Sequence, residues 1–140
     1  MISVEKLNET TNEFFNAYCK TGLFDSETIW SPKWNFKGEL HNNSRKGCYA
    51  HLADNEVVYI GLAIGNSLDG SGIGARVSKY WKKDKDYSST NQAYTSTVEG
   101  VTAIITLPFS EENFYLAAAL EVYLIQNLDG LRNKAYSRKN

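Results

Sequence analysis

The sequence predicts an α+β fold, in which a small antiparallel sheet of three strands is flanked by helices. Residues 48–53 and 57–63 place apolar side chains at every second position, as the two strands of a hairpin do. Residues 101–107 form a third apolar stretch of strand length. Residues 3–21 and 110–128 instead repeat apolar side chains at helical spacing. A chain of 140 residues has room for one domain of this kind.

The N-terminal part of the chain is expected to begin with an amphipathic helix over residues 3–21, for which Gly22 is a natural stop. Residues 23–46 contain two tryptophans, a proline and an Asn-Asn-Ser run, which indicates a long connection pinned by its aromatic side chains. We therefore predict that residues 1–46 are a helical extension packed on a core of residues 47–140. Together they would make one compact domain.

The predicted hairpin turns through a three-residue loop, Asp54-Asn55-Glu56, which places the even-numbered residues of both strands on one face. That face is apolar throughout and consists of Cys48, Ala50, Leu52, Val58, Ile60 and Leu62. The opposite face consists of Tyr49, His51, Val57 and Tyr59. The register therefore brings two tyrosines and a histidine together on the less apolar side of the sheet.

The segment after the hairpin is predicted to contain a glycine-rich loop over residues 64–72 and then a helix over residues 73–83. The inner face of this helix would hold Ile73, Val77, Tyr80 and Trp81. Residues 84–93 are polar and are expected to form a loop.

The C-terminal part is predicted to contain the third strand, which ends at Pro108, and the last helix. Ser110 is a good N-cap for that helix, because two glutamates follow it in the expected first turn. The helix would end near Leu128, before Gly130.

The composition excludes a membrane protein and gives no sign of secretion. No apolar run approaches the roughly 18 residues that a membrane span needs. The first residues lack the basic-then-apolar pattern of a secretory signal, and Cys19 and Cys48 have no metal-type spacing. A cytoplasmic location with free thiols is therefore expected.

The basic residues are distributed unevenly, although the net charge is only −1. Eleven of the fifteen lysines and arginines fall within residues 45–46, 76–85 and 132–139. Such clusters on a near-neutral protein favour a local phosphate-binding face. On charge alone, a solvated surface of mixed charge explains them equally well.

Glu121 is the most informative single residue. Its neighbours at helical spacing are apolar and include Ala117, Ala118 and Ile125. A carboxylate on an apolar helix face is costly unless a cation compensates it. That cation is either a divalent metal, which prefers oxygen ligands, or an arginine such as Arg76.

Arg76 directly follows the glycine-rich loop and stands in the first turns of its predicted helix. A guanidinium group can fork onto a phosphate, and the loop leaves backbone donors for the same anion. Lys79, Lys82 and Lys83 on the same helix would extend this phosphate-binding face. The alternative is that Arg76 is simply an exposed helix arginine.

Tyr49 and Tyr59 stand apart among the nine tyrosines because they share one face of the hairpin. A phenol has an ordinary pKa of about 10 and is a poor base at neutral pH. A nearby cation could lower that pKa enough for the phenol to accept a proton from water. Both tyrosines are therefore candidates for acid–base chemistry.

Taken together, these residues resemble the motifs of the GIY-YIG nuclease superfamily. Five motif elements occur in the family's order, with nine residues between the two tyrosines, and they span residues 47–133. In chain order they are Gly47-Cys48-Tyr49, Tyr59-Ile60-Gly61, Arg76 with Tyr80 four residues on, Glu121 with Leu124-Ile125, and Asn133. The resemblance implies the three-stranded α+β fold, with the N-terminal helix as an addition to it.

The resemblance also implies roles for the aromatic and basic residues. Tyr49 would be the general base or would orient the attacking water, and Tyr59 would support it by hydrogen bonding. Arg76 would bind the scissile phosphate and stabilise the charge of the transition state. Tyr80 occupies a position where family members carry a histidine or tyrosine, and it would contact phosphate.

The remaining motif residues concern the metal and the scaffold. By the resemblance, Glu121 would hold one Mg²⁺ or Mn²⁺ on the leaving oxygen. Asn133 would be structural and would tie the chain after the last helix to the site. Leu62 stands where the family often has a lysine, and His51, on the same face as the tyrosines, is a candidate substitute.

The function implied by the resemblance is metal-dependent hydrolysis of a DNA phosphodiester. Two alternatives stay open, a non-catalytic DNA-binding or interaction domain on the same scaffold and a nuclease subunit of a larger complex. A homodimer is equally compatible with the sequence.

Overall fold

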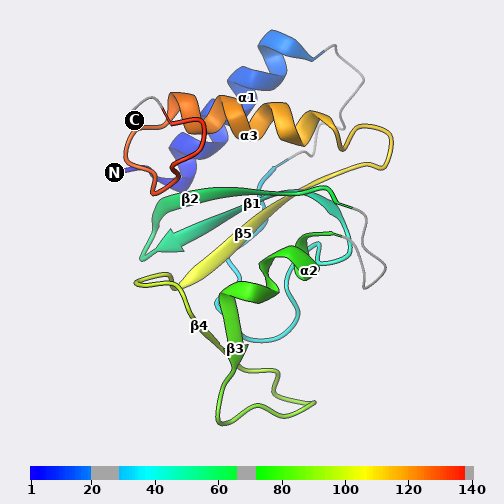
Figure 1. Ribbon diagram of the computed structural model, residues 1–140, viewed down its shortest axis with the longest axis vertical. Helices are drawn as coiled ribbons and strands as arrows, with labels where there is room; N and C mark the ends of the chain where they lie inside the picture. Colours follow the sequence, from blue (N-terminus) through cyan, green and yellow to red (C-terminus); the bar gives the residue numbers. More distant parts are fainter. Residues whose placement is uncertain (20–28, 66–71, 138–140) are drawn as a thin grey trace.

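The computed structural model describes residues 1–19, 29–65 and 72–137. Within these residues the chain is α+β, with an antiparallel three-stranded sheet in the order β2-β1-β5 and helices on both of its faces (Figure 1). The elements are α1 (Val4–Tyr18), β1 (Lys46–Ala53), β2 (Glu56–Ala63), α2 (Ile73–Val77), the 3-10 turn η1 (Ser78–Tyr80), β3 (Trp81–Lys83), β4 (Tyr94–Ser96), β5 (Ala103–Phe109) and α3 (Leu116–Asn127). The α+β class and the three antiparallel strands are confirmed. The predicted helix stop at Gly22 and most of the predicted glycine-rich loop lie outside the described residues.

Helix α1 is shorter than predicted. It begins after Ser3, whose hydroxyl accepts a hydrogen bond from the Lys6 N–H at 3.0 Å. It ends at Tyr18, because Cys19 has extended backbone angles (φ −120°, ψ 131°) while its N–H still bonds to the Phe15 carbonyl. The predicted continuation to residue 21 is therefore wrong at Cys19.

The β1–β2 hairpin turns through two residues, not the predicted three. Asp54 and Asn55 both have positive φ angles (50° and 47°), as a type I′ hairpin turn requires. The strands pair regularly up to His51 opposite Tyr59, after which a bulge makes Val57 the partner of Leu52. Because the loop is one residue shorter than predicted, β2 has one extra residue, and the bulge accommodates it.

The bulge decides which side chains face which core. Up to that point the predicted faces are correct, with Cys48, Ala50 and Ile60 in one buried cluster and Tyr49 in the other. Beyond it the prediction is wrong for two residues. Val57 joins the cluster of Cys48, and Val58 joins the cluster of Tyr49.

Both faces of the sheet are covered (Figure 1). Helices α1 and α3 lie on one face, where Leu7 and Phe14 of α1 join the first cluster. The second face is covered by α2, η1 and the segment around Trp34 and Phe36. The less apolar face of the hairpin is therefore a second core, in which Tyr49 is only 1% exposed.

Strand β5 runs through Pro108 to Phe109, one residue past its predicted end at Pro108. Proline is tolerated there because its nitrogen lies on the outer edge of β5, where the hydrogen bonds to residues 31–34 end at Thr106, so the missing N–H costs no bond to β1. Opposite Pro108, the backbones come very close. A Cβ at Gly47 would lie 2.0 Å from the Leu107 carbonyl oxygen, so the position requires glycine.

The predicted helix over residues 73–83 is wrong beyond Tyr80. Helix α2 and η1 occupy residues 73–80, and Trp81 then turns extended (φ −144°, ψ 165°). Strand β3 pairs with β4 from Trp81 opposite Ser96 to Lys83 opposite Tyr94. Pairing with a distant segment and packing of Trp81 against other rings override the local helical pattern here.

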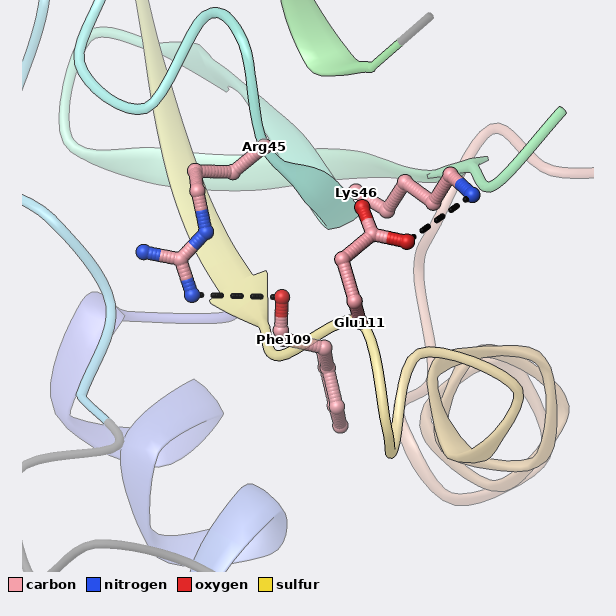
Figure 2. Close-up of polar contacts among 4 residues, drawn as sticks. All are labelled: Arg45, Lys46, Phe109 and Glu111. Atoms are coloured by element: carbon pink, nitrogen blue, oxygen red, sulfur yellow. Dashed lines mark hydrogen bonds and ion pairs between the residues drawn. The ribbon is translucent and has the colours of Figure 1, made fainter. Parts of the chain in front are cut away.

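Helix α3 begins at Leu116, so the predicted N-cap at Ser110 is wrong. Residues 111–115 form turns, so Glu111 does not lie in the first turn of the helix and instead forms an ion pair. Its carboxylate pairs at 3.3 Å with the ammonium group of Lys46, which is 6% exposed (Figure 2). Beside it, the Arg45 guanidinium donates to the Phe109 carbonyl at 3.2 Å (Figure 2). These two contacts join the start of β1 to the end of β5, so this basic pair belongs to the scaffold.

Candidate active site

Three tyrosines and a histidine form one aromatic cluster on the second face of the sheet. Tyr49 comes from β1, Tyr59 from β2 and Tyr80 from η1. The hydroxyls of Tyr49 and Tyr80 lie 3.2 Å apart and share a hydrogen bond. The His51 ring stacks on Tyr59 at 5.0 Å between centroids and meets the edge of Tyr80 at 4.5 Å. The structure therefore brings together all four aromatic residues singled out in the sequence.

Gly61 makes the position of Tyr49 possible. A Cβ at Gly61 would lie 2.1 Å from Cζ of the Tyr49 ring and 2.4 Å from its hydroxyl. Tyr49 is paired with Gly61 across the hairpin, so its ring lies over the backbone of β2 at a position without a side chain. Since any other residue at this position would displace the hydroxyl, the glycine of the second motif has a direct structural reason.

The tyrosine hydroxyls hold their protons firmly in the free protein. Burial, and then the hydrogen bond to Tyr80, raises the pKa of Tyr49 well above its ordinary range, although the positive charge of Arg76 opposes this. Burial and the neighbouring Tyr80 raise the pKa of Tyr59 to about 12. At neutral pH both phenols are therefore protonated and able to donate hydrogen bonds.

His51 is a buried base without a hydrogen-bond partner for one ring nitrogen. It is 2% exposed, and its Nε2 makes no hydrogen bond within the part of the chain that the structure describes. Burial, followed by the charges of Arg132 and Lys79, lowers the pKa of His51 to about 4. The ring is therefore neutral at physiological pH.

This shift in pKa predicts a pH dependence of stability. The unfolded chain takes up a proton at His51 near the ordinary pKa of 6.5, whereas the folded protein does so only near 4. The contribution is thus fully present above pH 6.5 and is lost as the pH falls toward 4. We expect His51→Leu to remove a pH-dependent term of about 2.5 kcal/mol between pH 7.5 and 4.5, measured by urea unfolding. His41→Gln, at an exposed histidine, is the control variant.

Arg76 and Glu121 approach the tyrosines from two different helices. Arg76 is exposed on α2, and its charge lowers the pKa of Tyr49, Tyr59 and Glu121. Glu121 is half-buried on α3, where burial raises the pKa of its carboxyl above the ordinary 4.5. Across residues 1–19, 29–65 and 72–137, no lysine or arginine forms an ion pair with Glu121 within 4.0 Å. The direct ion pair with Arg76, one alternative from the sequence, is therefore not formed.

The donor set at Glu121 fits a metal that is shared with a phosphate. Among the described residues, no group of three or more histidines, cysteines, aspartates or glutamates could hold a metal ion by itself. Mg²⁺, however, keeps several waters and commonly binds through one or two carboxylates together with substrate phosphates. A half-buried carboxylate that lacks a direct cationic partner suits that arrangement.

Asn133 attaches the segment after α3 to the free edge of β2. Its side-chain oxygen accepts from the Ile60 N–H at 3.0 Å, and its amide donates to the Ile60 carbonyl at 2.8 Å. Next to it, the Arg132 N–H bonds to the Val58 carbonyl at 2.7 Å. This attachment also brings the Arg132 charge toward His51, a neighbour that the sequence did not single out. Its adjacency to Asn133 is the signal that could have identified it.

The basic residues of the predicted helix are divided between different places. The Lys79 ammonium lies over the Tyr80 ring, 5.1 Å from its centroid. Lys82 and Lys83 are exposed on β3, where successive side chains point to opposite sides. Lys83 lies over the Tyr87 ring at 4.4 Å. The predicted single basic helix face is therefore wrong, because only Arg76 and Lys79 lie on α2 and η1.

The arrangement thus combines a phenol pair, a neutral imidazole, an exposed guanidinium and a half-buried carboxylate, contributed by both faces of the sheet.

Among the residues that the structure describes, no helix has the length and apolar character needed to cross a membrane. No family model, no curated protein and no solved structure matches the chain.

Proposed function

We propose that the chain is a metal-dependent endonuclease of the GIY-YIG type that hydrolyses a phosphodiester of DNA. One observation carries the proposal. Tyr49, Tyr59, Arg76 and Glu121 lie on four different elements, yet the charge of Arg76 lowers the pKa of each of the other three groups. A phosphate-binding cation, a metal-binding oxygen and hydroxyl groups that hold water are the groups that phosphodiester hydrolysis needs.

Arg76 binds the scissile phosphate in this proposal. Its guanidinium is exposed, and no carboxylate within the described residues pairs with it. It is therefore free to donate two parallel hydrogen bonds to phosphate oxygens. Its charge then stabilises the extra negative charge that develops on the phosphorus oxygens in the transition state.

Tyr49 orients the attacking water, and His51 assists it as a neutral imidazole in the same aromatic cluster. The raised pKa of the Tyr49 phenol favours a hydrogen-bonding role over a phenolate base in the free protein. His51, which replaces the lysine missing at Leu62, is neutral and lies 5.6 Å from the Tyr49 ring between centroids.

Glu121 holds the divalent metal, Mg²⁺ or Mn²⁺, together with the phosphate. When bound, the metal supplies positive charge to the leaving oxygen. The Glu121 carboxyl must be ionised to bind it. Because burial raises the pKa of this group, cleavage should weaken on acidification at a higher pH than an ordinary glutamate would cause.

A nicking assay tests the proposal. Supercoiled plasmid is incubated with the protein in Mg²⁺, in Mn²⁺ or in EDTA, and nicked and linear forms are measured. We expect cleavage only with metal, and a loss of roughly 10²-fold or more in Arg76→Ala. Lys6→Ala, which removes one exposed positive charge from α1, should cleave like the wild type. Absent cleavage would instead favour the non-catalytic DNA-binding alternative, and equal cleavage in EDTA would contradict the role of the metal at Glu121.

Salt dependence tests the basic residues of β3. If Lys82 and Lys83 contact DNA phosphates, the Lys82→Ala/Lys83→Ala variant should flatten the log–log dependence of affinity on salt by roughly one to two units. Turnover at saturating DNA should change little. The matched control is Lys6→Ala/Lys33→Ala, which removes two exposed lysines from elsewhere. Equal slopes in the two double variants would mean that the β3 lysines are only a solvated surface.

A further inference from the structure

A cavity beside the proposed cleavage site is lined by aromatic rings and amide side chains. Its volume is about 460 Å³, within the range of ligand-binding pockets. The lining residues are Trp34, Gly38, Glu39, Leu40, Asn43, Gly74, Trp81, Gln92 and Tyr94. None of these residues takes part in the chemistry proposed above, so the cavity calls for a role of its own.

The aromatic wall of the cavity is built by three rings from distant parts of the chain. Trp34 and Trp81 lie 4.8 Å apart between centroids, and Tyr94 lies 5.6 Å from Trp81. Trp34 is buried and donates its indole N–H to the Gly38 carbonyl at 3.2 Å, which fixes the wall. Trp81 and Tyr94 are only partly buried, so parts of their surfaces are accessible from solvent.

Polar side chains at the same cavity offer both donors and acceptors. Asn43 donates to one carboxylate oxygen of Glu39 at 2.9 Å, which holds that exposed carboxylate at the cavity. Within the described part of the chain, the side-chain amide of Gln92 makes no hydrogen bond. A ligand with a flat ring and an edge of alternating donors and acceptors would match these groups.

We propose that this cavity binds a single unstacked nucleobase of the DNA strand that the protein cleaves. Aromatic side chains stack on the π-face of any base. A carboxylate accepts from an exocyclic amino group, and an amide pairs with a donor–acceptor edge. The identity of the polymer rests on the proposed function, whereas the fit to a base rests on the cavity alone.

The position of the cavity relative to the cleavage site supports this occupant. Tyr80 contacts Tyr49 and His51, whereas the next residue, Trp81, contacts Trp34 and Tyr94. The tyrosine cluster and the cavity are therefore joined by two consecutive residues of the chain. Gly74, two residues before Arg76 on α2, also lines the cavity. A base next to a phosphate bound at Arg76 would therefore reach the cavity by leaving its stack.

The experiment measures binding in EDTA, so that cleavage plays no part. The probe is a short duplex with one bulged 2-aminopurine, compared with a fully paired duplex and with the same bulge made abasic. We expect the bulged base to raise affinity roughly 10-fold or more over the abasic bulge, and its fluorescence to be quenched on binding. Trp81→Leu and Glu39→Gln should each reduce this preference to less than about 3-fold.

The variants separate a loss of recognition from a loss of folding. Glu39 is exposed, so Glu39→Gln should fold like the wild type even if Trp81→Leu does not. Tyr115→Leu, at an exposed aromatic residue before α3, is the matched control and should keep the preference. Equal affinity for the bulged and abasic duplexes would overturn the inference, and so would a preference that Glu39→Gln and Trp81→Leu leave intact.

The two proposals fail in different ways. A protein that nicks plasmid with Mg²⁺ but shows no preference for the bulged base overturns the cavity assignment alone. A protein that binds the bulged base but nicks nothing with either metal overturns the nuclease assignment and leaves the base site in place.

Discussion

Replacing Glu121 by glutamine is expected to abolish metal-dependent cleavage while the fold is retained. The substitution is nearly isosteric and removes the charge that would hold the metal on the leaving oxygen. The carboxyl is half-buried and burial already raises its pKa, so a neutral amide at this position should not destabilise the protein. We expect residual nicking below about 1% of the wild-type rate, the scale of a lost catalytic charge, measured at saturating Mg²⁺ and again at saturating Mn²⁺.

A matched variant makes this result specific. Glu112 is exposed in the turns before α3, and Glu112→Gln removes the same charge without touching the tyrosine cluster. It should cleave like the wild type. Thermal unfolding of both variants checks the fold. If Glu121→Gln cleaves at more than a few per cent of the wild-type rate, Glu121 is not the metal ligand.

Replacing Tyr49 by phenylalanine is expected to lower the cleavage rate by about 10²-fold or more, the usual size of a lost acid–base or water-orienting group. The ring still packs across Gly61, and only the hydroxyl is lost. Loss of its hydrogen bond to Tyr80 should cost about 1 kcal/mol of stability. Tyr59→Phe should lower the rate less, because Tyr59 has a supporting role.

Tyr80→Phe is the control that separates chemistry from stability. It removes the same hydrogen bond from the other side and leaves the buried Tyr49 hydroxyl without this partner, so it should destabilise the protein at least as much as Tyr49→Phe does. Its effect on the rate should be smaller if Tyr49 is the residue that orients the water. Wild-type turnover in Tyr49→Phe would contradict the assignment and make His51 the leading candidate for the base.

Most of the site could be predicted from the sequence because its residues follow local patterns. Alternation along the hairpin places Tyr49, His51 and Tyr59 on one face, and the structure keeps them there. Helical spacing marks Glu121 as a carboxylate among apolar neighbours, and α3 includes it. Such patterns depend on one or two neighbouring elements, so the pattern itself carries the information.

The remainder depends on partners that are distant in the sequence. The buried Nε2 of His51 has no counterpart in any sequence motif, because it results from the packing of Tyr59 and Tyr80 around the ring. The electrostatic effect of Arg76 on Glu121 also depends on the tertiary structure, because α2 and α3 lie on opposite faces of the sheet (Figure 1). The spacing of Arg76 and Glu121 in the sequence does not indicate that they interact.

The α+β class, the antiparallel hairpin and the face shared by the tyrosines can be read from the sequence, because they follow from the period of the side chains. Three other features arise only in the folded structure. The positive φ angles of Asp54 and Asn55 shortened the turn, and the resulting bulge exchanged the faces of Val57 and Val58. Pairing with β4 changed the end of the predicted helix into β3, which separated Lys82 and Lys83 from Arg76 and created the aromatic cavity. The pairing of β3 with β4 is a long-range contact, and it stabilises a backbone conformation that the local helical pattern would not select.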